Sequence, residues 1–420
     1  MGRAAPCSDA PILTGFRKKG KTMGRERQAV IVSAVRTPIG SLNGSLSTIS
    51  ATELGAAAIR AALQAIHLPA ESVDEVMMGC VLSAGLGQAP ARQAALRAGL
   101  PYSVGATTIN KVCGSGLKAL IMATQMIRLA EGTTVVAGGM ENMSLAPYIL
   151  PRGLNGRSIG HIECRDSLVQ DGLWDVYNNC YMGTAAELCV SKFGIPRAEV
   201  DDVALESYQR AKGAIAEGRF AAELIPIEVP HPKGRSTVIT EDEEPNRVDL
   251  GKLRQLKPVF TPDGVVTAGN STSCNDGAAA LVVMAQEESE RRGIKPLATI
   301  VGSAASAVAP EWFSLAPVDA IQSVLKVTGL SLSDIDLFEI NEPFSAVLIA
   351  VIRQLGLDRT RINVNGGAVA LGHPIGASGA RIVTTLVHSL ESVGARRGLA
   401  TICIGGGEAL AIVIERGRQS

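Results

Sequence analysis

The sequence predicts a duplicated α/β fold of five layers, α-β-α-β-α, with a loop domain inserted into its first half. The length is one reason, because 420 residues correspond to two or three domains of ~150 residues each. The composition is another: 46% of the residues are hydrophobic but only 3% are aromatic, and the 45 glycines are about 11% of the chain against a usual ~7%. Such small side chains allow the tight backbone packing of large α/β proteins. An internal repeat is the third reason.

Four segments recur in the same order in the two halves of the chain, at an offset of roughly 265 residues. The first pair predicts short buried strands, and the second follows a predicted helix in each half. The third pair opens an apolar helix, and the fourth predicts a strand that ends in glycines. The pairs are 29–35 with 298–304, 73–76 with 335–338, 115–118 with 378–381, and 134–139 with 401–406.

The repeat defines an N-terminal half, residues 29–144 plus 265–285, and a C-terminal half, residues 295–420. Strands alternate with helices in each half, so we expect a mostly parallel sheet covered by helices on both faces. Two such halves related by a pseudo-twofold axis would share a central helix layer, which gives five layers. The functional site is then expected at the helix N-termini where the halves meet.

Residues 145–264 differ in composition from the two halves, because they contain Pro/Gly-rich stretches and an acidic run at 241–244. We expect them to form an inserted loop domain for substrate binding and oligomer contacts, because loops on a rigid scaffold often carry specificity. The acidic run is expected to be solvated surface. Residues 1–28 hold seven basic and two acidic residues and are predicted to be a flexible extension.

Charge and cysteine usage argue against several classes of protein. Forty basic residues balance forty acidic ones, so no electrostatic argument favours nucleic acid or an anionic membrane as partner. No stretch is apolar enough to span a membrane. The eight cysteines include no CxxC pair and the five histidines show no ligand spacing with them, so neither a disulfide scaffold nor a metal site is expected. A cytoplasmic location is predicted, with a mitochondrial one as the alternative because of the basic N-terminus.

Cys113 is the first candidate for chemistry. It lies in the stretch NKVCGSGLK, residues 110–118, directly before a predicted apolar helix. Unpaired N–H groups and the macrodipole at a helix N-terminus favour an anion and lower a cysteine pKa. The flanking glycines let the backbone approach a ligand closely. The alternative is an inert core cysteine.

Further candidates lie in the second half. His373 belongs to a glycine-rich loop ahead of a helix, in the repeat unit that matches the Cys113 segment. Cys403 opens CIGGG at a strand end, where glycine amides could bind an oxyanion. Asn341 begins NEPF, residues 341–344, at another strand end. A cysteine nucleophile, a histidine, a second cysteine and glycine amides could support acyl transfer through a thioester.

These motifs together resemble the motif set of the thiolase family. The matching segments are NKVCGSGLKA, AGGMENMS, NEPF, GGAVALGHPIGASG and CIGGG. Their order and spacing agree from about residue 28 to the C-terminus. The length and the Met182-Gly183 segment are most similar to the short-chain biosynthetic branch, whose activity is acetyl-CoA C-acetyltransferase.

The resemblance implies a role for each candidate residue. Cys113 would be the nucleophile that takes the acetyl group, and His373 would withdraw its proton and help bind the thioester oxygen. Cys403 would be the general acid/base that acts on the second acetyl-CoA. Asn341 would hold a water that completes one oxyanion hole, and the amides of Cys113 and Gly405 would form the other.

The resemblance also implies the ligands. Thr272, Met182 and Phe344 are expected to contact the substrate. The reaction would be a reversible ping-pong condensation of two acetyl-CoA to acetoacetyl-CoA and CoA, with coenzyme A as substrate and product and no metal or tightly bound cofactor. The family forms dimers or dimers of dimers, and residues 150–165 could supply a tetramer-forming loop.

Several positions depart from the family's pattern, namely Tyr181, Thr272, Pro343 and Glu408. They leave the acyl-chain preference open. A 3-ketoacyl-CoA thiolase of longer or branched chains is therefore an alternative. A decarboxylating ketoacyl synthase, which shares the fold and the nucleophile, is a second one that Cys403 in the final glycine motif disfavours. Trp312 and Phe313 lie where the family shapes its acyl pocket, but ordinary core packing is the expectation for both.

Overall fold

The computed structural model describes residues 27–150, 152, 161 and 163–417. The predicted N-terminal extension therefore falls outside the described residues except for its last two positions. Most of the predicted tetramer-forming loop, residues 150–165, falls outside them as well.

The first half builds a unit in which strands and helices alternate. Its elements in chain order are β1 (Ala29–Arg36), β2 (Gly40–Ser41), α1 (Ala51–Gln64), β3 (Glu75–Gly79), α2 (Pro90–Arg97), β4 (Gly105–Ile109), α3 (Ser115–Arg128), β5 (Thr134–Asn142) and, after a long excursion, β12 (Asn275–Ala285). A short helix, α7 (Gln286–Arg292), leads to the second half.

The second half repeats this order. It contains β13 (Ala298–Ala307), α8 (Ala316–Thr328), β14 (Leu337–Ile340), α9 (Ser345–Leu355), α10 (Ala368–Leu371), α11 (Ile375–Ser392), β15 (Arg397–Ile404) and β16 (Glu408–Glu415). A single parallel bridge between Phe338 and Ile362 stands where the first half has β4. The duplication predicted from the sequence is confirmed.

The strands form one sheet in the order β14-β15-β16-β13-β1-β12-β5-β3-β4. Only β3 with β4, β3 with β5 and β14 with β15 pair in parallel among the described strands of this path. The prediction of a mostly parallel sheet is therefore wrong, and the sheet is mixed. The reason is that β16 follows β15 through a tight hairpin without a helical crossover, which makes the pair antiparallel.

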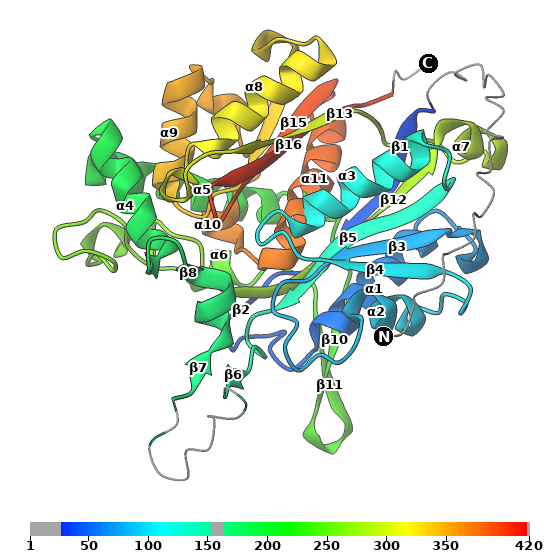
Figure 1. Ribbon diagram of the computed structural model, residues 1–420, viewed down its shortest axis with the longest axis horizontal. Coiled ribbons are helices and arrows are strands. Elements are labelled where there is room, and N and C mark those ends of the chain that lie inside the picture. Colours follow the sequence, from blue (N-terminus) through cyan, green and yellow to red (C-terminus); the bar gives the residue numbers. More distant parts are fainter. Residues whose placement is uncertain (1–26, 151, 153–160, 162, 418–420) are drawn as a thin grey trace, which may run out of the picture.

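The helices divide the molecule into layers (Figure 1). α3 and α11 lie between the two halves of the sheet and share one apolar core with them. α1 and α2 cover the outer face of the first half, and α8 and α9 cover that of the second. Alternation along β1 illustrates this arrangement, since Ile31 faces the central core and Val30 and Val32 face α1. This is the five-layer architecture that the sequence predicts.

Glycines allow the two central helices to touch. A Cβ placed on Gly379 of α11 would lie 2.4 Å from the Leu117 nitrogen of α3, and one on Gly116 would lie 2.8 Å from the Ala380 nitrogen. These are the matching glycines of the repeated motifs. The second motif lies one turn inside α11 rather than at its start, because α11 begins at Ile375.

The excursion between β5 and β12 holds the short strands and helices of the inserted region. They are β6 (Tyr148–Ile149), β7 (Arg165–Asp166), β8 (Trp174–Asp175), β9 (Cys180–Tyr181), α4 (Met182–Phe193), α5 (Arg197–Ala216), β10 (Ile227–His231), β11 (Arg235–Ile239) and α6 (Glu244–Arg247). The β10–β11 hairpin projects from the body of the molecule (Figure 1).

The prediction that the acidic run 241–244 is solvated surface is wrong for at least one of its residues. Asp242 is only 1% exposed and binds the Arg36 guanidinium through both oxygens, at 2.7 and 2.8 Å. Arg36 also contacts Glu223 at 2.5 Å. The prediction fails because the run caps a buried cation on β1, a pairing that only the tertiary structure creates.

Candidate active site

Seven of the eight predicted site residues line one cavity of about 210 Å³. They come from both halves and from the inserted region: Cys113, Met182, Thr272, Phe344, His373, Cys403 and Gly405. The eighth, Asn341, is not among the lining residues and lies buried just after β14. Two thiols and one imidazole that are far apart along the chain therefore reach a common space.

The loop that presents Cys113 is held in a strained shape. Val112 has a φ of 45°, a left-handed conformation that a β-branched residue rarely adopts. The Ser115 hydroxyl accepts a hydrogen bond from the Lys111 amide at 2.8 Å and donates one to the Val112 carbonyl at 2.6 Å. α3 begins at Ser115, so Cys113 stands directly before its first turn.

Burial dominates the ionisation of Cys113. It raises the pKa of this thiol to about 11, although hydrogen bonds from the amides of Gly405 and of Cys113 itself act in the opposite direction. The expected lowering of this pKa by the helix N-terminus is therefore wrong for the free protein. The thiol needs a base to become a nucleophile.

His373 lines the same cavity and is the candidate for that base. Its amide donates to the Asn275 Oδ1 at 2.8 Å, and its Nδ1 lies 2.5 Å from the Ser378 Oγ. Its Nε2 is buried and has no hydrogen-bond partner among the described residues. Burial, with the charge of Arg381, lowers the pKa of His373 to about 3, so the imidazole is neutral near pH 7.

Cys403 is the second-last residue of β15, next to the hairpin that carries Gly405. The positive φ angles of Gly406 (90°) and Gly407 (84°) form this turn. Burial raises the pKa of Cys403 well above the usual value, and the neighbouring Cys113 raises it further. The two thiols are thus close enough to influence each other's charge.

Asn341 has an unsatisfied side chain. It is 1% exposed, and neither its amide nitrogen nor its amide oxygen has a hydrogen-bond partner among the described residues. Its backbone N–H donates to the Thr401 carbonyl at 3.0 Å. A buried amide without partners is uncommon and fits a site that takes up a further polar group.

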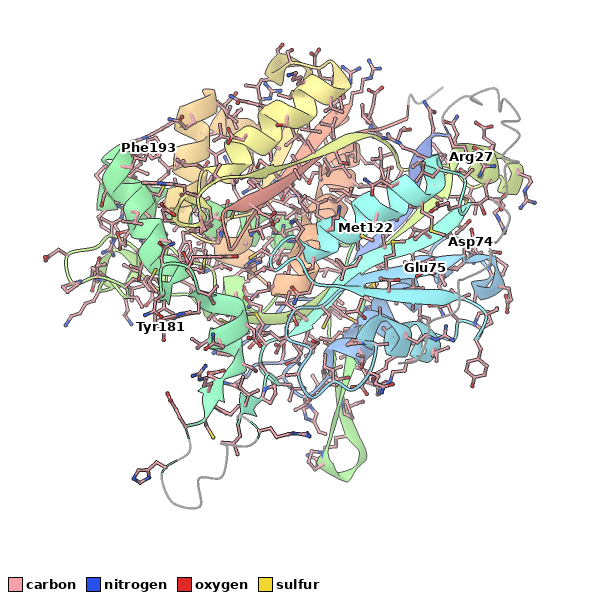
Figure 2. The ribbon with its side chains drawn as sticks, viewed as in Figure 1. Arg27, Asp74, Glu75, Met122, Tyr181 and Phe193 are labelled. Atoms are coloured by element: carbon pink, nitrogen blue, oxygen red, sulfur yellow. The ribbon has the colours of Figure 1, made fainter. Side chains whose placement is uncertain are left out.

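The wall opposite the thiols is apolar. Phe344 packs against Phe260 and Phe313, with ring centroids 6.1 and 6.5 Å apart. Core packing is the role that the sequence predicts for Phe313. The structure shows that this residue also lines the cavity. Met182 is the first residue of α4, and Tyr181 directly before it also lines the cavity. Figure 2 labels Tyr181 beside α4.

Thr272 holds the segment directly before β12 in place through two hydrogen bonds. Its hydroxyl donates to the Ala368 carbonyl at 2.7 Å, and its amide donates to the Pro343 carbonyl at 3.0 Å. The Thr272 hydroxyl proton is therefore engaged, while its oxygen can still accept a hydrogen bond.

Sequence reasoning missed one thiol at this site. Cys274 lines the cavity and bridges to His373 through the backbone. Burial raises its pKa to about 11, with Asp276 acting in the same direction. Its neighbour Asn275 holds the His373 amide, but no local pattern in the sequence marks that contact.

Metal ligands do not gather anywhere in the described residues, where no group of three or more His, Cys, Asp or Glu side chains could hold an ion. Within the same ranges, no helix has the length and apolar character needed to cross a membrane.

Comparison with known proteins agrees with this geometry. An acetyl-CoA acetyltransferase of Pseudomonas aeruginosa is 49% identical over 391 residues, which cover 93% of this chain and 100% of the relative. A mitochondrial acetyl-CoA acetyltransferase of Danio rerio is 50% identical over 390 residues, which cover 93% and 92%. The crystal structure of Acat5 thiolase from Ascaris suum in complex with coenzyme A superposes with a TM-score of 0.88 at 43% identity, covering 93% of this chain and 100% of that one.

The family assignment spans both halves. Residues 29–287 match the family described as "Thiolase, N-terminal domain", and residues 294–416 match "Thiolase, C-terminal domain". Together with the identity to these relatives over nearly their whole length, the matches establish that the chain belongs to the thiolase family.

Proposed function

We propose that this protein is an acetyl-CoA C-acetyltransferase, which reversibly condenses two acetyl-CoA into acetoacetyl-CoA and CoA. The observation that carries the proposal is the convergence of Cys113, His373 and Cys403 on one cavity. The names of the relatives and the coenzyme A in the Ascaris suum structure support the same substrates.

The first half-reaction makes an acyl-enzyme. The unpartnered Nε2 of neutral His373 takes the proton of the Cys113 thiol as the sulfur attacks the acetyl carbonyl. The bond between the carbonyl carbon and the CoA sulfur breaks, and the CoA thiolate leaves with the proton that His373 holds. The amide of Gly405, which faces the Cys113 sulfur, suits an oxyanion hole.

The second half-reaction forms the carbon–carbon bond. Neutral His373 takes the proton of the Cys403 thiol, and the thiolate so formed removes an α-proton from the second acetyl-CoA. The resulting carbanion attacks the acetyl carbonyl on Cys113, the bond from that carbon to the Cys113 sulfur breaks, and the sulfur recovers a proton from His373 as acetoacetyl-CoA leaves. A thiolate whose pKa is raised by burial is a stronger base, which suits an α-proton that is only weakly acidic.

Asn341 is proposed to hold a water that binds the thioester oxygen together with His373. Both groups have buried polar atoms without a protein partner among the described residues, and one water needs two to four such partners. Thr272, Met182 and Phe344 are proposed to contact the acyl and pantetheine parts of the substrate, because they line the same cavity.

Two variants test the roles of the thiols. With purified protein, acetoacetyl-CoA and CoA, thiolysis is followed as loss of the magnesium-enolate absorbance. Cys113→Ala should acquire no acetyl group by intact-mass spectrometry. Cys403→Ala should still acquire it, while condensation and thiolysis fall by at least about 100-fold.

The result that contradicts these roles is a Cys113→Ala protein that becomes acetylated at the wild-type rate. A strict requirement for a malonyl thioester would instead indicate a decarboxylating synthase. A panel of acetoacetyl-CoA, 2-methylacetoacetyl-CoA and longer 3-ketoacyl-CoA substrates tests the acyl-chain preference. We expect the acetoacetyl form to be preferred, because the cavity holds only about 210 Å³.

We also propose that the protein is a homo-oligomer, either a dimer or a dimer of dimers. Large apolar side chains are exposed where the inserted region begins: Leu145 (48%), Tyr148 (73%) and Leu150 (56%). Light scattering at several concentrations would test it, and a monomer at all of them would contradict it.

A cytoplasmic location is proposed, with mitochondria as the alternative, since one relative carries "mitochondrial" in its name. Fusion of residues 1–28 to a fluorescent protein tests this, because mitochondrial import of the fusion would favour the alternative.

A further inference from the structure

We infer that Ser378 is a positioning residue that fixes His373 in the tautomer with the proton on Nδ1, so that Nε2 faces the cavity as a free base. The inference rests on the proposed function, because it concerns the base of the acyl-transfer step. Its structural part concerns only the imidazole and one hydroxyl, and it can be measured without any turnover.

The contacts of the Ser378 hydroxyl are the first argument. This oxygen lies 2.9 Å from the Pro374 carbonyl, to which it donates, and 2.5 Å from the His373 Nδ1. A hydroxyl has one proton to donate and two lone pairs. If the proton goes to Pro374, the hydroxyl must accept from Nδ1–H. In the Nε2–H tautomer, Nδ1 is an acceptor, and the single hydroxyl proton can serve either Nδ1 or the Pro374 carbonyl. The other of these two short contacts would then place two acceptors against each other.

The second argument comes from the other ring nitrogen. Nε2 is buried and has no hydrogen-bond partner among the described residues. A buried N–H without a partner is rarer and more costly than a buried lone pair without one. An Nε2–H tautomer would therefore be destabilised by its unpartnered N–H, and its Nε2 could not accept the proton of Cys113. The Nδ1–H tautomer avoids both problems.

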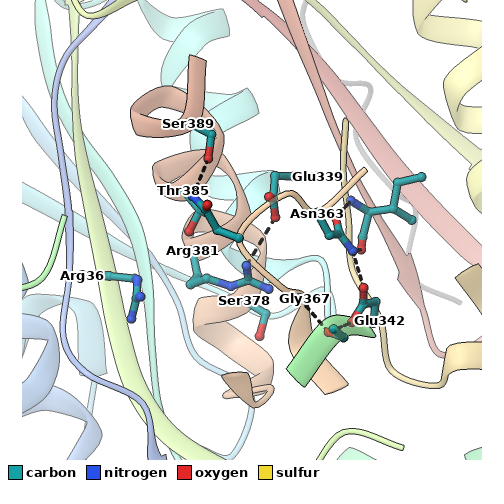
Figure 3. A network of polar contacts seen from close by, with 12 residues as sticks. Arg36, Glu339, Glu342, Asn363, Gly367, Ser378, Arg381, Thr385 and Ser389 are labelled. Atoms are coloured by element: carbon teal, nitrogen blue, oxygen red, sulfur yellow. Dashed lines mark hydrogen bonds and ion pairs between the residues drawn. The ribbon is translucent and has the colours of Figure 1, made fainter. Parts of the chain in front are cut away.

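The hydroxyl itself is rigidly placed. Ser378 is 0% exposed and lies in the first turns of α11, where its amide donates to the Pro374 carbonyl at 2.9 Å. Figure 3 shows it on the same helix as Arg381, which pairs with the buried Glu339 at 3.5 Å. The backbone of His373 is fixed as well, because its amide donates to the Asn275 Oδ1 at 2.8 Å. The backbone of His373 and its Nδ1 are thus each held by a hydrogen bond.

The titratable side chains that line the cavity with the imidazole are the thiols of Cys113, Cys274 and Cys403 and the phenol of Tyr181, and the charge of Arg381 acts on the ring as well. None of them is a carboxylate, which is the usual partner that sets a histidine tautomer. Among the described contacts of the ring, Ser378 is the group that can do so.

The direct test is nitrogen NMR of protein labelled with ¹⁵N-histidine. The signals of His373 are assigned by their loss in His373→Asn. In the wild-type protein we expect the pattern of a protonated Nδ1 and an unprotonated Nε2. In Ser378→Ala we expect this pattern to give way to a mixture of tautomers or to Nε2–H. A wild-type spectrum with the proton on Nε2 would overturn the inference, whether or not the protein is a thiolase.

The kinetic test uses a matched control. Ser33→Ala makes the same change at another buried serine, one whose hydroxyl has no partner among the described residues. We expect acetylation of Cys113 by acetyl-CoA to slow at least about tenfold in Ser378→Ala and to stay unchanged in Ser33→Ala. The KM for acetyl-CoA should change little, because Ser378 does not line the cavity.

Equal acetylation rates in Ser378→Ala and Ser33→Ala would overturn the positioning role. If Ser378→Ala fails to fold, the wild-type NMR spectrum still decides the tautomer. If no variant and not even the wild type forms an acyl-enzyme, the proposed function fails, while the NMR result judges the Ser378 assignment independently.

Discussion

At the scale of single residues, burial and the backbone amides of Gly405 and Cys113 act on the pKa of Cys113 in opposite directions. Its sulfur receives hydrogen bonds from two backbone amides, but loss of water outweighs them and the pKa rises to about 11. His373, with a pKa near 3, is also neutral. The resting pair is therefore a thiol and an imidazole rather than a thiolate and an imidazolium, and charge develops only during acyl transfer.

The neutral state of the Cys113 thiol predicts how its rate of alkylation depends on pH. The rate at which iodoacetamide modifies Cys113 should rise about tenfold per pH unit from pH 7 to 10, because the thiolate fraction rises toward a pKa of about 11. Mass spectrometry of the Cys113 peptide measures this rate, and Cys113→Ser shows the background from other cysteines. A rate that levels off below pH 8 would indicate a preformed ion pair and contradict the prediction.

At the scale of elements, the contact between α3 and α11 depends on missing side chains. The two helices belong to different halves, and each carries part of the site: Cys113 precedes α3, and His373 precedes α11. Gly379 lets the α3 backbone approach so closely that any side chain there would meet the Leu117 nitrogen. The separation of these helices therefore sets the separation of Cys113 and His373, the proposed nucleophile and its proposed base.

Gly379→Ala is accordingly expected to destabilise the protein by about 1–3 kcal/mol, because the added methyl must push backbone apart. Gly213→Ala is the matched control: Gly213 is also within a helix, α5, but nothing lies within 4 Å of the position of its Cβ. That change should stabilise by up to about 1 kcal/mol through helix propensity. Urea unfolding measures both, and equal effects would show that the helices are not in tight contact.

At the scale of the whole molecule, a buried ion cluster joins the inserted region to the sheet. Arg36 of β1 contacts Glu223 and Asp242, and all three side chains are almost fully buried. Burial acts to lower the pKa of Arg36, but the two carboxylates outweigh it and hold that pKa above its usual value. The cluster therefore keeps its charges and fixes the inserted region to the first half.

Removing the cation should leave the buried carboxylates of Glu223 and Asp242 without the positive charge that they contact. Arg36→Met is expected to cost about 3–5 kcal/mol of unfolding free energy. Arg254→Met removes an arginine from an exposed pair with Asp202 and should cost about 0–1 kcal/mol. Urea titrations of the two variants at pH 7 provide the comparison. A small loss in Arg36→Met would mean that the cluster contributes little to holding the inserted region.

The sequence by itself determined the duplication, the family and the candidate residues. Repeated apolar periods and glycine motifs are local, and they predict strands, helices and loops wherever neighbours along the chain decide the structure. Cys113, His373 and Cys403 could be named on this basis, and the structure brings all three to one cavity.

Only the tertiary structure decided strand direction, burial and charge state. The antiparallel pairing of β1 with β12, the burial of Asp242 and the position of Cys274 at the cavity depend on segments far apart in the sequence. The same is true of the raised pKa of Cys113 and of the Ser378 contact with His373. The physical reason is that desolvation and hydrogen-bond partners are set by what packs around a group in three dimensions, which local periodicity does not encode.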